Sequence, residues 1–414
     1  MIKTEIKTLD NGLTLVMCQD KSRHSVYAEI ITKFGGMTKD YIKDGQEYHL
    51  MDGIAHLLEH ALIDGATEGN LLDYYSKNYV TFNGFTTKNE TSFFIDVVKD
   101  FNSHLEKLLK AINTPSFTEE TLEVTKQPIY DEIRKHDDKR FRNFNEAYDE
   151  MLLKNTNYKN NLGTIEDIRN IPYEEVRRCH ELFYQPKNQM LIISGNFDIE
   201  EITELVNNVY NSFNKEYEEF TYIKLNEEKT FEEKERTIID NNEEEMVNIT
   251  YKVDISDIKP HDSLLLSFYI WYFLRFNFDD TSVLFQEMLD KKYSIFSIDT
   301  QISKIEDYLY IDIASYTKEK DYFITRVNEI INNRGYINSE KFELLKKRGL
   351  VTQIMKEENC NEVLKLLVGN ITDHNYYEPD TIEDINSLNI EEYKNMIESL
   401  DFSNYFVIVQ KKED

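Results

Sequence analysis

The sequence predicts an α+β protein of two tandem homologous domains, each a largely antiparallel sheet with helices packed on one face. The chain has 414 residues, more than one hydrophobic core usually serves. The segment TIEDI at 164–168 returns at 381–385, a shift of 217 residues, and strand and helix patterns mix without regular βαβ alternation. We therefore expect domains at 1–222 and 237–414, joined by a charged, proline-free linker at 223–236.

The repeat keeps its register beyond this motif. The glutamate pair at 174–175 matches the pair at 391–392 at the same shift. Each copy then ends in an apolar, strand-like run, at 190–193 in the first copy and 405–409 in the second. Two copies of one domain explain this register.

Several elements of the first domain can be placed in order. A hairpin turn signal, Asp-Asn-Gly, occupies 10–12 between alternating apolar residues. Strand patterns follow at 79–87 and 91–97. A helical pattern covers 119–138 and is opened by a capping box, although Pro128 inside it removes one backbone hydrogen bond and should kink the helix.

The composition narrows the class of protein. The formal net charge of −29 argues against a nucleic-acid partner, because binding phosphates needs clustered Lys and Arg, but it is compatible with basic peptides. Three cysteines, odd in number and far apart, indicate a reducing compartment and have no metal-binding spacing. The N-terminus has no signal-peptide pattern, and the most apolar segment, 264–276, is too short to cross a bilayer. We expect a cytoplasmic protein with no membrane partner.

The most informative segment is HLLEH at 56–60. On a helix, positions i, i+3 and i+4 share one face, so His56, Glu59 and His60 should point into the same space. Two neutral imidazoles can bind Zn²⁺, and a nearby carboxylate that does not bind the metal can accept a proton from the attacking water. Apolar residues flank the motif, and burying three polar groups without partners would cost several kcal/mol. The segment predicts half of a zinc site, in the reversed order of the inverted zincins; the alternative is a hydrogen-bonded core cluster.

The second copy of the domain lacks these groups. The 217-residue shift maps the three polar residues of the motif onto Phe273, Phe276 and Asn277. The second domain is therefore expected to keep the helix and to lack the metal.

The third metal ligand should lie on the long helix that follows. Catalytic zinc usually has three protein ligands and one open position. Ile129 and Ile133 define the buried face of this helix, and Glu132, next to that face, is the carboxylate that we expect to turn inward. Asp131 is the first alternative because of the kink, and Glu123 is the second; an ordinary exposed acid remains the alternative to any ligand role.

A strand edge beside such a site could bind substrate. An extended peptide can add to an exposed edge as a further strand, which gives affinity through the main chain. Asn83 is the candidate substrate contact, although beside Gly84 it is equally typical of a turn or bulge.

The chain resembles the pitrilysin/insulinase family of inverted zincins, and within it the half-length bacterial members similar to the processing-peptidase β subunit. The resemblance rests on these segments: 52–60, Asn83 with Thr86 and Thr91, 129–138, 162–164 and the strand that ends at Gly195. It covers the first half of the chain well and the second half loosely. It implies that His56, His60 and Glu132 bind Zn²⁺ and that Glu59 is the general base.

Two features depart from the family pattern. Members usually carry another glutamate seven residues before the third ligand, where this chain has Thr125, so the ligands should rely on a different neighbour for orientation. The family's second domain usually supplies an Arg and a Tyr that bind the substrate backbone and the developing oxyanion. The region 289–296 lacks such a pair, and no arginine occurs between Arg275 and Arg326. Losing this stabilisation would slow hydrolysis about a hundredfold or more.

The resemblance thus implies a zinc-dependent endopeptidase subunit that hydrolyses peptides or unfolded segments inside a two-chain clamshell chamber. The expected partner is a homologous chain that lacks the zinc motif and supplies the Arg and Tyr, which makes a heterodimer. A self-sufficient homodimeric peptidase is one alternative. The other is a non-catalytic peptide-binding or assembly subunit of the same fold, which Thr125 and the missing pair favour and the intact HLLEH motif opposes.

Overall fold

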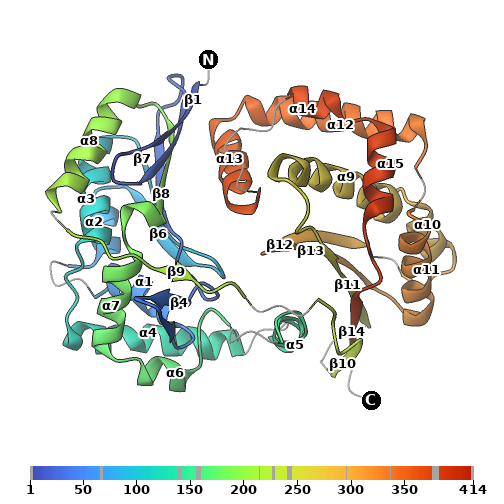
Figure 1. Ribbon diagram of the computed structural model, residues 1–414, viewed down its shortest axis with the longest axis horizontal. Coiled ribbons are helices and arrows are strands. Elements are labelled where there is room, and N and C mark those ends of the chain that lie inside the picture. Colours follow the sequence, from blue (N-terminus) through green and yellow to red (C-terminus); the bar gives the residue numbers. More distant parts are fainter. Residues whose placement is uncertain are drawn as a thin grey trace. The chain divides into compact units, whose positions relative to one another are not determined.

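The computed structural model describes residues 3–65, 69–137, 142–154, 160–213, 215–225, 229–239, 245–294, 296–335, 337–374 and 382–411. The chain forms two compact units, each with its own sheet and helices (Figure 1). The first comprises Met1–Asp138, Asn157–Leu225 and Glu357–Val368, and the second Lys139–Thr156, Asn226–Lys356 and Gly369–Asp414. The predicted α+β class with two domains is confirmed. Within the described ranges, no helix has both the length and the apolar composition that a membrane span requires.

A six-stranded sheet forms the centre of the first unit, in the order β1-β2-β8-β3-β7-β6. Neighbouring strands are antiparallel except for the parallel pair β2 and β8. The strands are β1 (Lys3–Thr8), β2 (Thr14–Gln19), β3 (Val26–Thr32), β6 (Thr81–Thr86), β7 (Thr91–Val97) and β8 (Gln189–Gly195). The predicted β1–β2 hairpin turns through Gly12, whose φ of 91° favours glycine. β6 is an edge strand, because β7 is its one neighbour in the sheet among the residues that the structure describes.

Helices of the first unit share one core with this sheet. They are α1 (Ile54–Ile63), α2 (Leu71–Lys77), α3 (Phe101–Asn113), α4 (Glu119–Asp137), α6 (Ile165–Asn170), α7 (Tyr173–Phe183) and α8 (Ile199–Ser212). Strand residues such as Leu15 and Ile30 lie in the same buried cluster as the helix residues Leu58 and Leu109. A separate small sheet has the order β5-β4-β9 and consists of β4 (Asp40–Lys43), β5 (Gln46–His49) and β9 (Thr221–Tyr222). Burial of this apolar surface is the main source of stability.

The second unit has a five-stranded sheet in the order β10-β14-β11-β13-β12. The strands are β10 (Glu235–Ile239), β11 (Met246–Asp254), β12 (Asp299–Ile305), β13 (Tyr308–Tyr316) and β14 (Tyr405–Lys411). The helices of the second repeat are α9 (Pro260–Phe278), α10 (Val283–Asp290), α11 (Lys320–Asn332), α12 (Ser339–Glu357), α13 (Cys360–His374), α14 (Ile382–Ser387) and α15 (Ile390–Ser399). Here β10 and β14 are the parallel pair, and the other neighbours are antiparallel.

The two sheets share one topology. Strands β2-β8-β3-β7-β6 correspond, in order and in relative direction, to β10-β14-β11-β13-β12. Helix α14 lies 217 residues after α6 at both of its ends, which is the shift predicted from the repeated TIEDI segment. The tandem homologous domains are therefore confirmed. By the same correspondence, α9 and α12 are the counterparts of α1 and α4.

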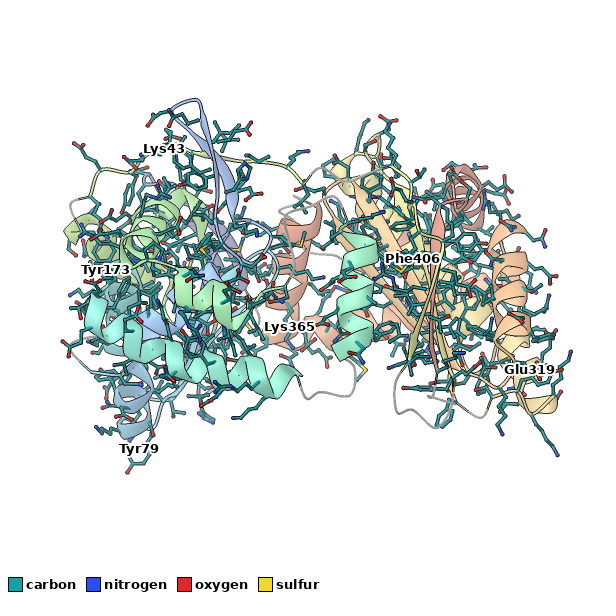
Figure 2. All side chains as sticks on the ribbon, turned by 90° about the horizontal axis from the view of Figure 1, so that it is seen from below. Lys43, Tyr79, Tyr173, Glu319, Lys365 and Phe406 are labelled. Carbon is teal, nitrogen blue, oxygen red and sulfur yellow. The ribbon has the colours of Figure 1, made fainter. Side chains whose placement is uncertain are left out.

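Each unit also contains helical residues from the other repeat. Helix α5 (Arg142–Leu152) belongs to the second unit, where it lies beside Phe406 of β14 (Figure 2). The Tyr148 hydroxyl donates to Asp312 Oδ2 at 2.9 Å, and the Tyr148 ring contacts that of Phe406. The start of α13 belongs to the first unit, where Cys360 Sγ lies 2.5 Å from the carbonyl oxygen of Cys18 in β2. Because β2 and β14 carry apolar side chains on both faces, the face away from the main core also needs cover. Helices packed on only one face of each sheet would leave the apolar side chains of the other face exposed to solvent.

Part of the predicted linker 223–236 is packed in the second unit. Strand β10 begins at Glu235. Phe231 is buried, and its ring lies 4.7 Å from that of Phe406 between centroids. The boundaries at residues 222 and 237 stay a prediction.

Candidate active site

Helix α1 presents the HLLEH motif from inside the first unit. It begins after Gly53, whose φ is 81° and where an added Cβ would lie 2.4 Å from the carbonyl oxygen of Leu162. A side chain at this position would be strained in conformation and would collide with backbone. All residues of α1 except His60 are buried, and His60 is partly buried. The close packing at Gly53 thus allows α1 to place two imidazoles and one carboxylate within the core.

Both imidazoles face the same carboxylate oxygen. His56 Nε2 lies 3.5 Å and His60 Nε2 lies 3.7 Å from Glu132 Oε2 on α4. The ligand atoms of these three residues all lie within 4.8 Å of one another. Ligands bound to one tetrahedral Zn²⁺ at about 2.0–2.1 Å are roughly 3.3 Å apart. The donor set and its spacing therefore fit a zinc ion. The Glu132 side chain is 49% exposed, so one side of the group is open to solvent.

The other acids of α4 point elsewhere. Asp131 accepts a hydrogen bond from Arg134 at 2.8 Å, and both side chains are more than 60% exposed. Glu123 pairs with the buried Lys126 at 2.6 Å. Helix α4 continues through Pro128 and keeps Glu132 turned toward α1. The structure thus brings Glu132, rather than the two alternatives, to the histidines.

Asp64 orients one of the histidines and was not anticipated from the sequence. His60 Nδ1 lies 3.4 Å from Asp64 Oδ2, and Asn70 donates to the other Asp64 oxygen at 2.6 Å. Such a contact fixes the ring and leaves Nε2 for a metal. The signal was present in the sequence, because Asp64 follows His60 by four residues and so shares its helix face. Thr125, where the family usually has a glutamate, instead donates to the carbonyl oxygen of Thr121 on its own helix.

Charge at the two histidines differs because their surroundings differ. Burial, reinforced by the neighbouring His60, lowers the pKa of His56, and its Nδ1 has no hydrogen-bond partner among the described residues. Burial also acts to lower the pKa of His60, but contacts with Asp64 and Glu132 outweigh it and the pKa is raised. Since a metal requires neutral imidazole, we expect zinc uptake to release a proton from His60.

Glu59 lies beside the three candidate ligands, in surroundings that change its pKa. Burial raises the pKa of its carboxyl to about 7, although the Thr86 hydroxyl, donating to Oε2 at 2.6 Å, acts to lower it. Thr86 Oγ1 is also 3.3 Å from Thr91 Oγ1, which in turn donates to the carbonyl oxygen of Phe34. A Cβ on Gly84 would lie 3.2 Å from Glu59 Oε1, so the backbone of β6 runs directly beside the carboxylate. A pKa near neutrality suits general acid–base catalysis.

Asn83 lies on the edge strand that passes this carboxylate. It is exposed, and its backbone is in register with Phe94 of β7. Its place is that of a strand residue rather than of a turn. Its role in substrate binding stays a prediction.

The second repeat has no equivalent ligand cluster among its described residues. Phe273 and Asn277 are buried in α9, and the Asn277 amide donates to the carbonyl oxygen of Phe273 at 2.8 Å. The 217-residue shift places Gly349 of α12 opposite Glu132. The cluster of His56, His60 and Glu132 is the one group of metal-ligating side chains found within the described ranges.

Comparison with known proteins agrees with this site. The profile of the insulinase family, peptidase family M16, matches residues 41–165, and that of the peptidase M16 inactive domain matches residues 170–348. The uncharacterized zinc protease YmfH of Bacillus subtilis is 26% identical over 367 residues, which cover 86% of this chain and 84% of that protein. The zinc protease PqqE of Helicobacter pylori is 26% identical over 215 residues, 49% of this chain and 46% of that protein.

Solved structures share the fold over the whole chain. A putative M16-like peptidase from Alicyclobacillus acidocaldarius superposes with a TM-score of 0.86 at 20% identity, covering 100% of this chain and 99% of that one. The periplasmic protease PqqL from Escherichia coli superposes with a TM-score of 0.76 at 15% identity, covering 99% of this chain but 48% of that one. This chain therefore corresponds to about half of PqqL.

Proposed function

This chain belongs to the insulinase family of peptidases, peptidase family M16, and from that premise we propose that it is a zinc-dependent endopeptidase subunit acting on peptides or unfolded segments. The observation that carries the proposal is the meeting of His56, His60 and Glu132 around one point, with Glu59 beside them. The named relatives are zinc proteases, which supports the same chemistry.

Each residue of the site has a separate proposed role. His56, His60 and Glu132 would hold Zn²⁺, which when bound polarises the scissile carbonyl and makes water a better nucleophile. Glu59 takes the proton from the attacking water and later gives it to the leaving amine, and burial, which raises the pKa of its carboxyl, favours both transfers. Thr86 holds the Glu59 carboxylate in place through its 2.6 Å hydrogen bond.

The edge strand β6 is the proposed substrate platform. Its outer backbone groups have no strand neighbour among the described residues, so an extended peptide can add to the sheet there. Asn83 is exposed on this strand and would contact the added peptide. Main-chain recognition requires an extended substrate, which favours peptides and unfolded segments over folded proteins.

We further propose that a second, homologous chain completes the enzyme. The chain matches about half of PqqL, and its region 289–296 lacks the Arg and Tyr that the family resemblance leads one to expect. Within this region Lys291 lies over the Tyr322 ring at 4.2 Å, and outside it Arg326 is paired with Glu287. A heterodimer with a chain that lacks the zinc motif is preferred over a homodimer, and cytoplasmic location stays a prediction.

Substitutions at Glu59 and Glu132 test the division of roles. Glu59→Gln keeps the shape but removes the base, so peptide hydrolysis should be lost while Zn²⁺ remains bound at about one ion per chain. Glu132→Gln should weaken zinc binding itself, whereas the matched variant Asp131→Asn should leave it unchanged. Elemental analysis and chelator competition measure both. A wild-type protein that takes up no zinc when metal is supplied would refute the enzyme and favour a non-catalytic subunit.

Mixing experiments test the partner. The chain alone should hydrolyse unfolded peptides poorly, and addition of a homologous chain that lacks the zinc motif should raise turnover about a hundredfold, the usual effect of oxyanion donors. Glu59→Gln in the mixture is the control for activity from the added chain. Full activity of this chain alone would reject the heterodimer and favour the homodimer.

A further inference from the structure

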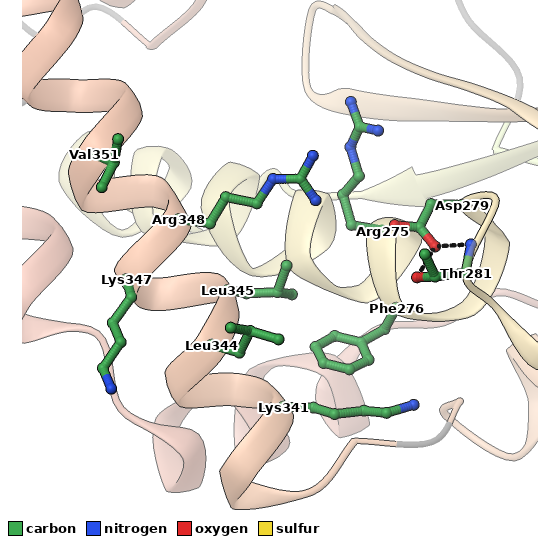
Figure 3. Close-up of a pocket in the computed structure, with 10 residues that line it drawn as sticks. All are labelled: Arg275, Phe276, Asp279, Thr281, Lys341, Leu344, Leu345, Lys347, Arg348 and Val351. Atoms are coloured by element: carbon green, nitrogen blue, oxygen red, sulfur yellow. Dashed lines mark hydrogen bonds between the residues drawn. The ribbon is translucent and has the colours of Figure 1, made fainter.

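A pocket of about 670 Å³ opens between helices α9 and α12 of the second unit (Figure 3). Its apolar residues include Phe276 from α9 and Leu344 and Leu345 from α12. Leu345 is buried, whereas Leu344 is 65% exposed. The pocket therefore has an apolar wall that solvent reaches.

This pocket lies on the pair of helices that corresponds to the pair carrying the candidate metal ligands in the other repeat, but the counterparts of the ligands themselves, Phe273, Asn277 and Gly349, do not line it. Helices α9 and α12 are the counterparts of α1 and α4, and the 217-residue shift places Phe276 opposite Glu59 and Gly349 opposite Glu132. An added Cβ at Gly349 would lie 2.9 Å from the Tyr272 hydroxyl of α9, so the two helices approach closely at this point. The helix pair that holds a candidate metal site in one repeat thus frames an open pocket in the other.

The charge of the pocket is opposite to that of the chain. Four of its residues are cationic (Arg275, Lys341, Lys347 and Arg348) and one is anionic, Asp279, which gives a local excess of three positive charges against −29 for the whole chain. The Asp279 carboxylate already accepts hydrogen bonds from the backbone N–H and the hydroxyl of Thr281, at 2.8 and 2.6 Å. Among the described residues, Asp279 forms no ion pair with Arg275 or Arg348.

Two arginines reach the same side of the pocket from different helices. Figure 3 shows the guanidinium groups of Arg275 and Arg348 on one side of Phe276 and Leu345, and Lys341 on the other. Among the described residues, neither arginine forms an ion pair with a carboxylate. The Arg275 guanidinium lies over the Trp271 ring at 5.4 Å, a contact that leaves its charge unbalanced by an acid. Guanidinium groups on this side of the pocket can donate charge-assisted hydrogen bonds to the carboxylates of a ligand.

The apolar surface extends past the pocket along α12. Val351 at its border is 58% exposed, and Met355, one turn further on, is 67% exposed. From Leu344 to Met355 this strip spans twelve residues of helix, a rise of about 16 Å at 1.5 Å per residue. Such a length exceeds a compact small ligand and suits a short polypeptide segment.

We propose that the α9–α12 pocket is a docking site for a polypeptide segment that carries acidic residues next to large apolar side chains. The carboxylates would lie at Arg275 and Arg348, and the apolar side chains would cover Phe276, Leu344 and Val351. The site is distinct from the candidate zinc centre, and its binding requires neither metal nor hydrolysis.

Fluorescence anisotropy on the full-length chain tests this proposal. The probe is a short fluorescein-labelled peptide in which a glutamate pair precedes a run of Leu and Phe, and the control peptide has lysines in place of the glutamates. The protein carries Glu59→Gln and is kept free of zinc, so the probe stays intact. Saturable binding of the acidic peptide, at least about tenfold tighter than the lysine peptide, is expected.

Variants localise the binding. Arg275→Ala with Arg348→Ala should weaken binding about tenfold or more, and Leu344→Ser about fivefold, because both alter exposed side chains and leave the core intact. Arg177→Ala, which removes an exposed arginine of α7 in the first unit, should have no effect.

Several outcomes would overturn the proposal. Unchanged affinity in the double arginine variant, or equal affinity for the lysine peptide, would do so. Binding of dodecanoate without binding of the peptide would identify a small amphipathic acid as the occupant instead. Self-association that the same variants abolish, without peptide binding, would identify a second copy of the chain. Because no step requires zinc, failure here leaves the proposed peptidase function standing, and loss of that function leaves this test valid.

Discussion

Replacing Thr86 by valine should raise the pH at which Glu59, the proposed general base, becomes ionised. In the wild type, burial raises the pKa of Glu59 to about 7 against the opposing hydrogen bond from the Thr86 hydroxyl at 2.6 Å. That hydrogen bond stabilises the ionised carboxylate. Without it, the pKa of Glu59 should rise further, because Thr86 no longer offsets the effect of burial. Valine preserves the shape of the side chain and removes only the donor.

The size of the effect follows from the energy of the bond. A hydrogen bond to a charged group contributes about 1.5–3 kcal/mol, and about 1.4 kcal/mol corresponds to one pH unit. The pKa of Glu59 should therefore rise by about one to two. Since a carboxyl is protonated below its pKa, the acid limb of the pH profile should move up by about one to two pH units. Hydrolysis on the acid side of that limb should fall roughly 10- to 100-fold and recover at more alkaline pH. Zn²⁺, when bound, would lower the pKa in both proteins, so the prediction concerns the shift between the two profiles and not the absolute position of either limb.

The assay is the pH profile of kcat/KM on a quenched fluorescent peptide, with zinc content measured in parallel. Thr86→Ser, which keeps the hydroxyl, is the matched control and should follow the wild type. Infrared difference spectroscopy on the zinc-free proteins measures the pKa of Glu59 directly. The carboxyl band of Glu59 is identified by its absence in Glu59→Gln. This band should titrate at a higher pH in Thr86→Val than in the wild type. If the acid limb of the pH profile and the titration of the carboxyl band are both unchanged in Thr86→Val, Thr86 does not affect the pKa of Glu59.

Two further predictions concern metal binding and acid stability. Asp64→Ala should weaken zinc binding about 10- to 100-fold, because the contact at His60 Nδ1 that orients the ring is lost; chelator competition measures this, and an effect no larger than that of Asp131→Ala would contradict it. His180 is buried, and burial lowers its pKa to about 3, so between pH 7 and 5 the unfolded chain binds a proton that the folded chain does not. Stability should therefore fall by about 2 kcal/mol from this residue over that range. Urea unfolding at both pH values should show this loss in the wild type and not in His180→Gln, and equal pH dependence in the two proteins would refute it.

The positions of His56, Glu59 and His60 on one helix face could be predicted because they depend only on helical periodicity. The doubled domain could also be predicted, since the repeated TIEDI segment starts equivalent helices in both repeats. Asp64 could have been found by the same i, i+4 reasoning. Each of these features depends either on one helix alone or on the alignment of two repeated segments.

Other features depend on packing between elements that are distant in sequence. Thr86 reaches Glu59 from a strand 27 residues away, and no local pattern marks it as the partner of a base. The segment 139–156 precedes the predicted linker but belongs to the second unit. Its amphipathic pattern predicts a helix without indicating which sheet it covers.

The sequence by itself determined the α+β class, the two homologous domains, the half-site on α1 and its absence from α9, because local periodicity and internal repetition encode them. Only the tertiary structure decided which acid of α4 faces the histidines, since Asp131 and Glu132 are adjacent and their direction depends on how α4 packs against α1. The tertiary structure likewise decided that the same pair of helices in the second repeat leaves a cationic pocket. The physical reason is that side chains from separate helices acquire a common environment only when packing brings those helices together.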